Sequence, residues 1–246
     1  MAPTESLIRE KSPEVWKKTL ACYGKVLKAK ADTKSKPAAR KELVQLDEWY
    51  QNELPQILKD QKFIKKEELE KLMKWKLARG KFRPTLPSLI ASNKESDVEK
   101  HSKAAFAKMP NLTPAINNLT LLRGVGPATA SAILAAYDEN APFMADESVL
   151  GVPGIGVVKY DLVCYTKFAE AVQEKTAQLK ELDPDYGWTA HKVELAIWTY
   201  VMANQLDKSL IAEVNESISN NAGKENKRGK RKSDVVDEDG AKKIKK

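Results

Sequence analysis

The sequence predicts an all-α fold, and three features support that expectation. No segment alternates apolar and polar residues at the period of two that marks a half-buried strand. Typical helix-start pairs, in which a capping residue precedes proline, occur in the folded part of the chain. Apolar residues recur at helical spacing, as they do near the N-terminus at Val15, Trp16, Leu20, Tyr23 and Leu27.

Each helix is expected from its spacing and from the residues at its ends. Ser12-Pro13 marks the start of a helix over 13–30, and Gly80 marks the end of one over 65–79. No internal repeat is present at any fixed period. We therefore expect a flexible N-terminus over 1–10 and one all-α domain over 11–220, with further helices over 38–52, 95–108, 114–122, 127–137, 157–180, 189–205 and 207–219.

Composition limits the class of protein. With 42% apolar residues in 246, the chain can bury a sizeable core, and no run suggests a signal peptide or a membrane span. Cys22 and Cys164 lie far apart without metal-ligand spacing, so we expect no disulfide framework, no metal site and no cofactor. The expectation is an intracellular monomer without a membrane partner.

The C-terminal segment differs from the rest in charge. Residues 221–246 hold 10 Lys or Arg and 5 Asp or Glu, so they supply most of the net charge of +8. Few apolar residues are present there to bury, which predicts disorder. The basic clusters at 227–232 and 242–246 resemble a two-part nuclear import signal, although a solubilising tail is the alternative. A nuclear import receptor is the expected partner of this segment.

Two glycines separated by one residue lie between the helices expected over 114–122 and 127–137. The chain has only 11 glycines, and Gly124 and Gly126 are placed where it must reverse direction. The first N–H groups of the second helix have no carbonyl partner, so they are donors for an anion such as a nucleic-acid phosphate. A plain helical hairpin with glycines for a tight bend is the alternative.

The spacing around these glycines resembles a known family. The pattern L-x-G-V-G-x-x-T-A-x-x-I, from Leu122 to Ile133, followed by Tyr137 and Asp146, resembles the helix-hairpin-helix DNA glycosylases over residues 112–148. The segment 72–84, LMKWKLARGKFRP, together with the hairpin and PFMADES, also resembles the Amun family of nuclear glycosylase-like proteins. Both resemblances imply a multi-helix glycosylase-like fold.

The resemblance also implies roles for particular residues. In that superfamily an aspartate about twenty residues past the hairpin is the catalytic carboxylate, and Asp146 has this position. Family members that form a Schiff base use a lysine where this chain has Ala128, so a monofunctional glycosylase is implied. The hairpin would hold DNA through Gly124, Val125, Gly126, Ala128 and Thr129.

The surroundings of Asp146 depart from the family pattern. Met144-Ala145 precede it, where the family usually has a valine, and Glu147 follows it. Glu147 would either raise the pKa of Asp146 by like-charge repulsion or act as a first-turn acid of the next helix. The alternative for Asp146 itself is a helix cap in a protein that has lost catalysis.

A basic stretch precedes the hairpin. It combines cations that could contact DNA phosphates with two aromatic residues that could stack on a flipped base, Trp75 and Phe82. Alternatively, Trp75 belongs to the core and the charges form a solvated face. The cations are Lys74, Lys76, Arg79, Lys81 and Arg83.

Two weaker candidates complete the set. His191 is expected in the first turn of a helix, where a structural role is the alternative to a place in a base pocket beside Trp75, Phe82 and Glu147. The VPGIG segment at 152–156 imitates a second hairpin, and we interpret it as a loop.

The sequence therefore supports three hypotheses. The first is a nuclear, monofunctional DNA glycosylase of base-excision repair, and the second is a catalytically inactive nuclear DNA-binding or scaffold protein on the same fold. The third is a helical interaction protein whose glycines serve packing alone. The sequence does not identify the base, because its pocket is assembled from distant segments.

Overall fold

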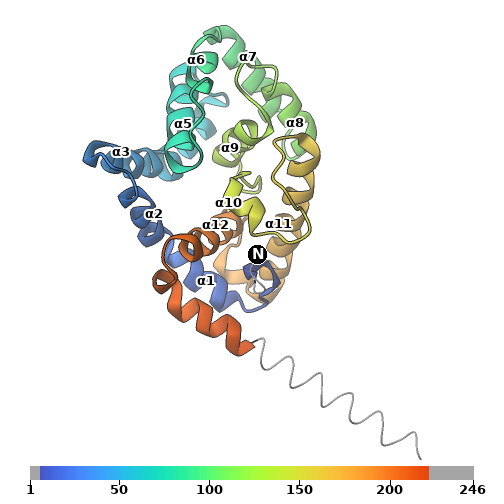
Figure 1. The fold of residues 1–246 in the computed structure, drawn as a ribbon. Coiled ribbons are helices and arrows are strands. Elements are labelled where there is room, and N and C mark those ends of the chain that lie inside the picture. Colours follow the sequence, from blue (N-terminus) through green and yellow to red (C-terminus); the bar gives the residue numbers. More distant parts are fainter. Residues whose placement is uncertain (1–5, 222–246) are drawn as a thin grey trace, which may run out of the picture.

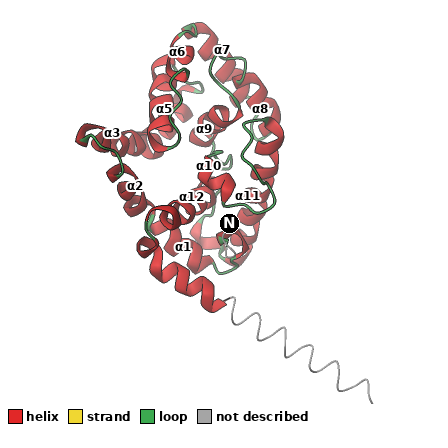
Figure 2. Cartoon of the chain, in the orientation of Figure 1, coloured by secondary structure: helices red, strands yellow, loops and turns green. Residues whose placement is uncertain are grey.

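A computed structural model describes residues 6–221 and confirms the all-α fold, since this part of the chain contains helices and no strand (Figure 2). None of its helices is long and apolar enough to cross a bilayer. The expected disordered tail with its import signal lies outside the described residues, apart from Asn221.

Most of the described residues are in α-helices joined by short turns. A π-helical turn, η2 (Trp49–Glu53), and three short 3-10 helices, η1 (Leu7–Arg9), η3 (Pro184–Tyr186) and η4 (Lys208–Ile211), lie between them, and 212–221 is helical. The α-helices are α1 (Pro13–Ala21), α2 (Tyr23–Asp32), α3 (Pro37–Glu48), α4 (Leu54–Gln61), α5 (Lys66–Arg79), α6 (Leu86–Ala91), α7 (Glu95–Phe106), α8 (Leu112–Leu119), α9 (Pro127–Tyr137), α10 (Asp146–Leu150), α11 (Leu162–Leu182) and α12 (Ala190–Leu206).

Two central helices organise the fold (Figure 1). Helix α9 contacts α4, α5, α8 and α11, and helix α12 contacts α1, α2, α10 and α11. Both are apolar on nearly every face, as is typical of a helix that is surrounded by others. The short helix α10 packs on α12, so the segment between α9 and α10 joins the two groups of helices.

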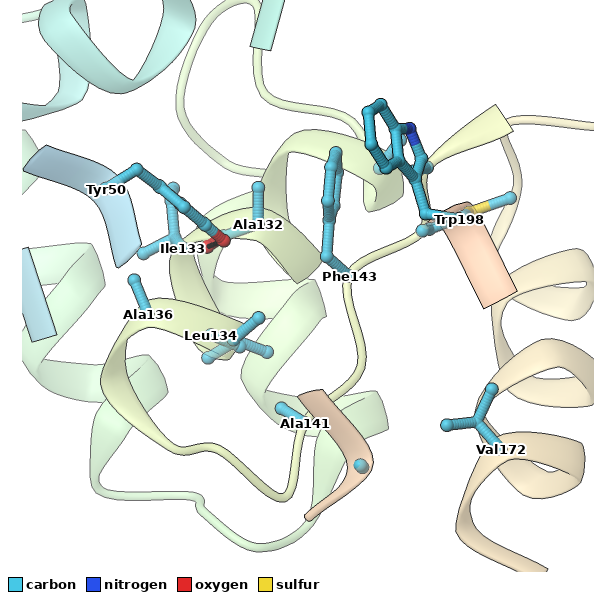
Figure 3. Close-up of a cluster of buried hydrophobic side chains, with 14 of the residues drawn as sticks. Tyr50, Ala132, Ile133, Leu134, Ala136, Ala141, Phe143, Val172 and Trp198 are labelled. Carbon is cyan, nitrogen blue, oxygen red and sulfur yellow. Dashed lines mark hydrogen bonds between the residues drawn. The ribbon is translucent and has the colours of Figure 1, made fainter. Parts of the chain in front are cut away.

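Small side chains let neighbouring helices approach α9 closely. Residues 128–136 are all buried, and five of these nine residues are alanine. Figure 3 shows Ala132, Ile133 and Leu134 of α9 between Tyr50 on one side and Phe143 on the other. The Tyr50 hydroxyl donates a hydrogen bond of 2.8 Å to the carbonyl oxygen of Ala132, which satisfies the buried phenol.

Several helix boundaries differ from the expected ones. The helix expected over 13–30 is divided at Cys22 into α1 and α2. Helix α8 begins at Leu112, so Pro114 lies at its third position and not at its first. Helix α11 begins at Leu162, five residues later than expected, because the Asp161 side chain caps it by accepting a hydrogen bond from the Cys164 N–H at 2.8 Å.

Three short helices, α4, α6 and α10, were not among the expected ranges, although a helix start was considered at Asp146 and Glu147. Each spans five to eight residues, too few for a helical apolar pattern to stand out in the sequence. The N-terminus differs too, because Leu7 is buried and the Ser6 hydroxyl donates to the Gly151 carbonyl at 2.7 Å. From Ser6 onward, the segment expected to be flexible packs on the domain.

The turn between α8 and α9, residues 120–126, is fixed by its surroundings. Gly124 has φ +78°, and a Cβ added there would lie 2.9 Å from the Leu89 Cβ of α6. The buried Asn93 holds the preceding residue, since it accepts from the Arg123 N–H at 2.8 Å and donates to the Arg123 carbonyl at 2.9 Å. Gly126 has an ordinary φ of −98°, and its missing Cβ faces open space.

We predict that the two glycines differ in their effect on stability. Gly124→Ala should lower the free energy of unfolding by about 1–3 kcal/mol, because the left-handed backbone and the contact with Leu89 both oppose a side chain. Gly126→Ala should change it by less than about 1 kcal/mol. Urea denaturation of the two variants measures both, and equal losses would contradict the described turn.

Candidate functional site

A cavity of about 390 Å³ lies where three distant segments of the chain meet, within the size range of ligand sites. We call it the Asp146 cavity. The end of α5 and the loop after it form one wall, the start of α9 forms a second, and residues 143–147 with Tyr160 form a third. Its lining includes Lys76, Arg79, Lys81, Arg83, Gly124, Gly126, Ala128, Thr129, Phe143, Asp146, Glu147 and Tyr160.

The hairpin contributes backbone to this cavity. Gly126 is exposed, and within residues 6–221 no acceptor receives the N–H groups of Gly126 and Ala128. The next two amides, of Thr129 and Ala130, donate to the Gly126 carbonyl at 3.0 and 2.9 Å. Two free donors therefore remain at the N-terminus of an 11-residue helix, where its dipole also favours an anion.

The side chains of the other expected hairpin contacts are buried. Val125, Ala128 and Thr129 have 5%, 5% and 3% of their surface exposed. They pack inside the domain, although Ala128 and Thr129 also reach the cavity wall. Of the five residues expected to contact DNA here, only Gly126 is exposed, and the exposed side chains of the turn are those of Leu121 and Arg123.

Asp146 is the first residue of α10 and is half-buried in the cavity wall. The cap position belongs to Ala145, and no side-chain cap hydrogen bond forms there, so the helix-cap alternative for Asp146 is wrong. Instead, Asp146 Oδ2 accepts a hydrogen bond of 2.7 Å from the Tyr160 hydroxyl. Glu147 lines the same cavity one residue later.

Tyr160 is the functional candidate that the sequence did not reveal. It lies in the loop between α10 and α11, where a helix was expected, and Arg83 Nη2 donates to its hydroxyl at 3.2 Å. Burial, and then the hydrogen bond to Asp146, raise the pKa of Tyr160, so the hydroxyl keeps its proton at neutral pH. Its only signal in the sequence is its position, fourteen residues after Asp146.

The expected basic stretch divides into three groups. Lys76, Lys81 and Arg83 line the cavity, whereas Lys74 is exposed and does not. Burial lowers the pKa of Lys76, and the charge of Asp146 opposes that effect. Arg79 also lines the cavity, but it is 2% exposed and is therefore no surface contact for a phosphate.

The two aromatic candidates have different positions. Trp75 is fully buried, stacks on Tyr50 with ring centroids 3.4 Å apart, and donates from Nε1 to Asp47 Oδ1 at 2.8 Å. The expectation that it stacks on a base is wrong, because it belongs to the core. Phe82 is 68% exposed between two cavity residues, Lys81 and Arg83, and stays a candidate for contact with a large ligand.

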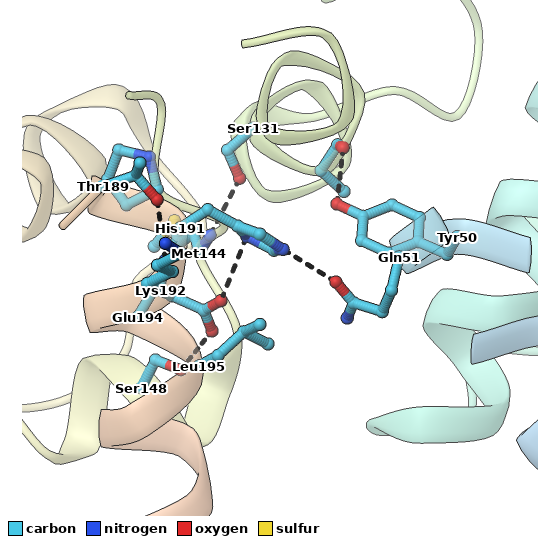
Figure 4. Close-up of polar contacts among 12 residues, drawn as sticks. Tyr50, Gln51, Ser131, Met144, Ser148, Thr189, His191, Lys192, Glu194 and Leu195 are labelled. Carbon is cyan, nitrogen blue, oxygen red and sulfur yellow. Dashed lines mark hydrogen bonds and ion pairs between the residues drawn. The ribbon is translucent and has the colours of Figure 1, made fainter. Parts of the chain in front are cut away.

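His191 lies outside the Asp146 cavity and belongs to a buried polar cluster (Figure 4). Its Nε2 is 2.7 Å from Gln51 Oε1, and its Nδ1 is 3.8 Å from Glu194 Oε2. Burial, followed by the nearby charge of Arg79, lowers the pKa of His191 to about 4. The imidazole is therefore neutral and structural, and its expected place in a base pocket is wrong.

Glu194 joins this cluster to α10. Its carboxyl is fully buried, and Oε1 accepts a hydrogen bond of 2.5 Å from the Ser148 hydroxyl, two residues after Asp146. Burial raises the pKa of Glu194 to about 7, although the charge of Arg79 opposes the shift. The start of α10 is thus anchored to α12 by a carboxyl group that titrates near neutral pH.

Comparisons of the chain with protein-family models, curated proteins and solved structures find no match. Within residues 6–221, no group of three or more His, Cys, Asp or Glu side chains is placed to hold a metal ion. The site must therefore be interpreted from its own residues.

We predict that Glu194→Gln stabilises the protein at high pH. A folded-state pKa of about 7, above the ordinary 4.5, means that Glu194 favours folding at low pH and loses this contribution as pH rises from 4.5 towards 7. His191 has the opposite effect, because its contribution to the free energy of unfolding is lost as pH falls from 6.5 towards 4. The variant should gain roughly 2–3 kcal/mol at about pH 8 and much less at about pH 5.

Chemical denaturation at both pH values measures this difference. The exposed Glu181, on α11, provides the control, since Glu181→Gln should leave the pH dependence unchanged. Equal stabilities of wild type and Glu194→Gln at about pH 8 would mean that Glu194 ionises without cost in the folded chain.

Proposed function

We propose that this chain is a DNA-binding protein of the helix-hairpin-helix type and a monofunctional DNA glycosylase. The observation that supports this most is the composition of the Asp146 cavity. Segments far apart in sequence bring together a carboxylate, two free amides at a helix N-terminus and a set of cations. This is the combination needed to hold a DNA phosphate beside a sugar whose glycosidic bond is to be broken.

The proposed DNA contact is the turn at Gly126. Backbone amides bind phosphate without reading the base, so they position the duplex and leave selectivity to the cavity. Lys81 and Arg83, which also line the cavity, would neutralise further phosphates, and Phe82 between them would contact the bases. A nuclear location, directed by the basic tail, accompanies this proposal.

The proposed reaction is hydrolysis of the bond between the sugar C1′ and a base nitrogen. The electron pair of that bond leaves with the base, positive charge develops at the sugar, and a water oxygen bonds to C1′. Asp146 would stabilise that charge and take the proton from the water. Tyr160, by donating to Oδ2, would hold the carboxylate in one orientation and leave Oδ1 for the water.

We predict that Asp146→Asn abolishes most excision. Asparagine keeps the volume and an acceptor for Tyr160 but removes the charge, so excision should fall at least about a hundredfold while DNA affinity stays nearly unchanged. A panel of lesion-bearing duplexes, followed by alkali to cleave abasic sites, measures it. Glu147→Gln, in the same cavity wall, is the matched control and should lose far less activity.

The same assay tests the monofunctional assignment. Ala128 offers no amine, so borohydride should trap no protein–DNA adduct, and strand breaks should require alkali. An adduct that maps to Lys76, the lysine next to Asp146 in the cavity, would overturn this assignment and leave the glycosylase intact. If no lesion is processed and DNA binding persists, the protein is the non-catalytic DNA-binding protein.

We predict that Gly126→Val weakens DNA binding without unfolding the chain. The position has ordinary backbone angles and open space, so valine fits, but it blocks approach to the free amides. Affinity should fall alike for all duplex sequences, as measured by fluorescence anisotropy at fixed salt. Unchanged affinity would support the helical interaction protein, and a sequence-selective loss would place the DNA contact elsewhere.

A further inference from the structure

Lys76 brings an unpaired ammonium group to the Asp146 cavity. It lies on α5, is half-buried, and lines the cavity together with Asp146 and Arg83. Its Nζ atom makes no hydrogen bond or ion pair with residues 6–221, and it is not among the polar atoms that the fold covers completely. Its three donors are therefore open to a ligand that enters the cavity.

Arg79, three residues further along α5, is in the opposite situation. Its guanidinium carbon lies 4.0 Å from the centroid of the Trp198 ring and 5.7 Å from that of Phe143, and its Nε and Nη2 atoms are fully covered. No ligand reaches those two atoms, so the guanidinium belongs to the core. Lys76 is the cation of α5 that remains available within the cavity.

Two neighbouring charges place the Lys76 ammonium near the acidic part of the cavity. The Asp146 carboxylate attracts it, and the Arg83 guanidinium repels it. No ion pair forms between Lys76 and Asp146, which is held instead at Oδ2 by the Tyr160 hydroxyl. An ammonium and a carboxylate that interact without pairing are both free for one ligand in the cavity.

Its surroundings also make Lys76 a stronger acid than a lysine in water. Burial lowers the pKa of Lys76 from the ordinary 10.5, and the charge of Asp146 opposes that effect. A general acid works best when its pKa lies near the working pH, so a downward shift brings a lysine closer to that condition.

The departing base determines whether an acid is needed. When the C1′–N bond breaks, its electron pair stays on the base nitrogen. A neutral base therefore leaves as an anion unless a proton reaches it, whereas a base that carries a positive charge from ring alkylation leaves as a neutral molecule. A proton donor beside the base thus accelerates the departure of neutral bases.

We infer that Lys76 is the general acid of the proposed reaction: its ammonium donates a proton to the departing base, and neutral bases are the substrates. The inference rests on the proposed glycosylase function and names its substrate class. Lys76 gives one proton to the base, Asp146 takes one from the attacking water, and exchange with solvent restores both groups. The products are the protonated, neutral base and an abasic sugar.

Excision of two bases from duplex DNA by the full-length protein tests the inference. Hypoxanthine is neutral, whereas 7-methylguanine is a cation in the nucleotide and leaves without a proton. Lys76→Met should lower hypoxanthine excision on the order of 100-fold or more and change 7-methylguanine excision by less than about threefold. Lys74→Met, exposed on the same helix and outside the cavity, should change neither. Equal losses for both bases would overturn the inference.

Lys76→Arg separates proton donation from charge. Arginine keeps the positive charge but holds its proton far more tightly, so this variant should lose hypoxanthine excision as Lys76→Met does. A rate equal to that of the wild type would overturn the inference. Thermal denaturation checks that both variants fold. If neither does, the wild type decides, because its hypoxanthine excision should fall as rising pH deprotonates Lys76, and a rate that rises with pH contradicts an acid.

Failure of the inference and failure of the proposed function give different results. Hypoxanthine excision that does not depend on Lys76, or excision of 7-methylguanine alone, overturns the general acid and leaves the glycosylase. No excision of any base in the lesion panel contradicts the enzyme and the general acid with it. A borohydride adduct at Lys76 makes this residue a nucleophile, which overturns both the inference and the monofunctional assignment.

Discussion

The burial of one guanidinium constrains most of this fold. Arg79 comes from α5, the ring it packs on most closely comes from α12, and Phe143 comes from the segment between α9 and α10. Taking a cation out of water is costly, so these three elements must stay together with the carboxylates of Asp47 and Glu194 near it. The position of α10, and with it of Asp146, follows from that assembly.

The same constraint explains the buried polar clusters around Arg79. Asp47 is 3% exposed, and its two oxygens accept from the Tyr23 hydroxyl and the Trp75 indole, so the carboxylate is hydrogen-bonded and faces the cation at longer range. On the other side, Glu194 anchors Ser148 and lies next to a neutral His191. Each carboxylate thus serves both the charge balance and the placement of a helix.

How well each helix could be predicted from the sequence depended on its number of residues. Long segments with helical spacing, such as α5, α9 and α12, were predicted within a few residues, and Gly80 caps α5 as expected. Short helices such as α10 have too few residues to show a period. A buried arginine or tryptophan cannot be told from an exposed one by composition, which is why Arg79 was assigned to a binding surface and Trp75 was left between that surface and the core.

The candidate site could be predicted in its parts and not in its assembly. The spacing of Gly124, Gly126 and Asp146 was visible in the sequence, and the structure places all three around one cavity. The roles of the two glycines, however, differ: Gly124 is required by its backbone and its contact with α6, whereas Gly126 leaves space and free amides. The sequence alone does not distinguish these two roles, because they depend on tertiary contacts such as that of Asn93 with the turn.

Tyr160 is the clearest example of a site residue that only the tertiary structure identifies. Its hydroxyl donates to Asp146 and accepts from Arg83, so one phenol links the carboxylate to the basic segment that follows α5. Because its pKa is raised, the hydroxyl remains a donor, and a donor fixes a carboxylate without neutralising it. Under the proposed function, a carboxylate held in this way, between cations that do not pair with it directly, would face the positive charge that develops on the sugar.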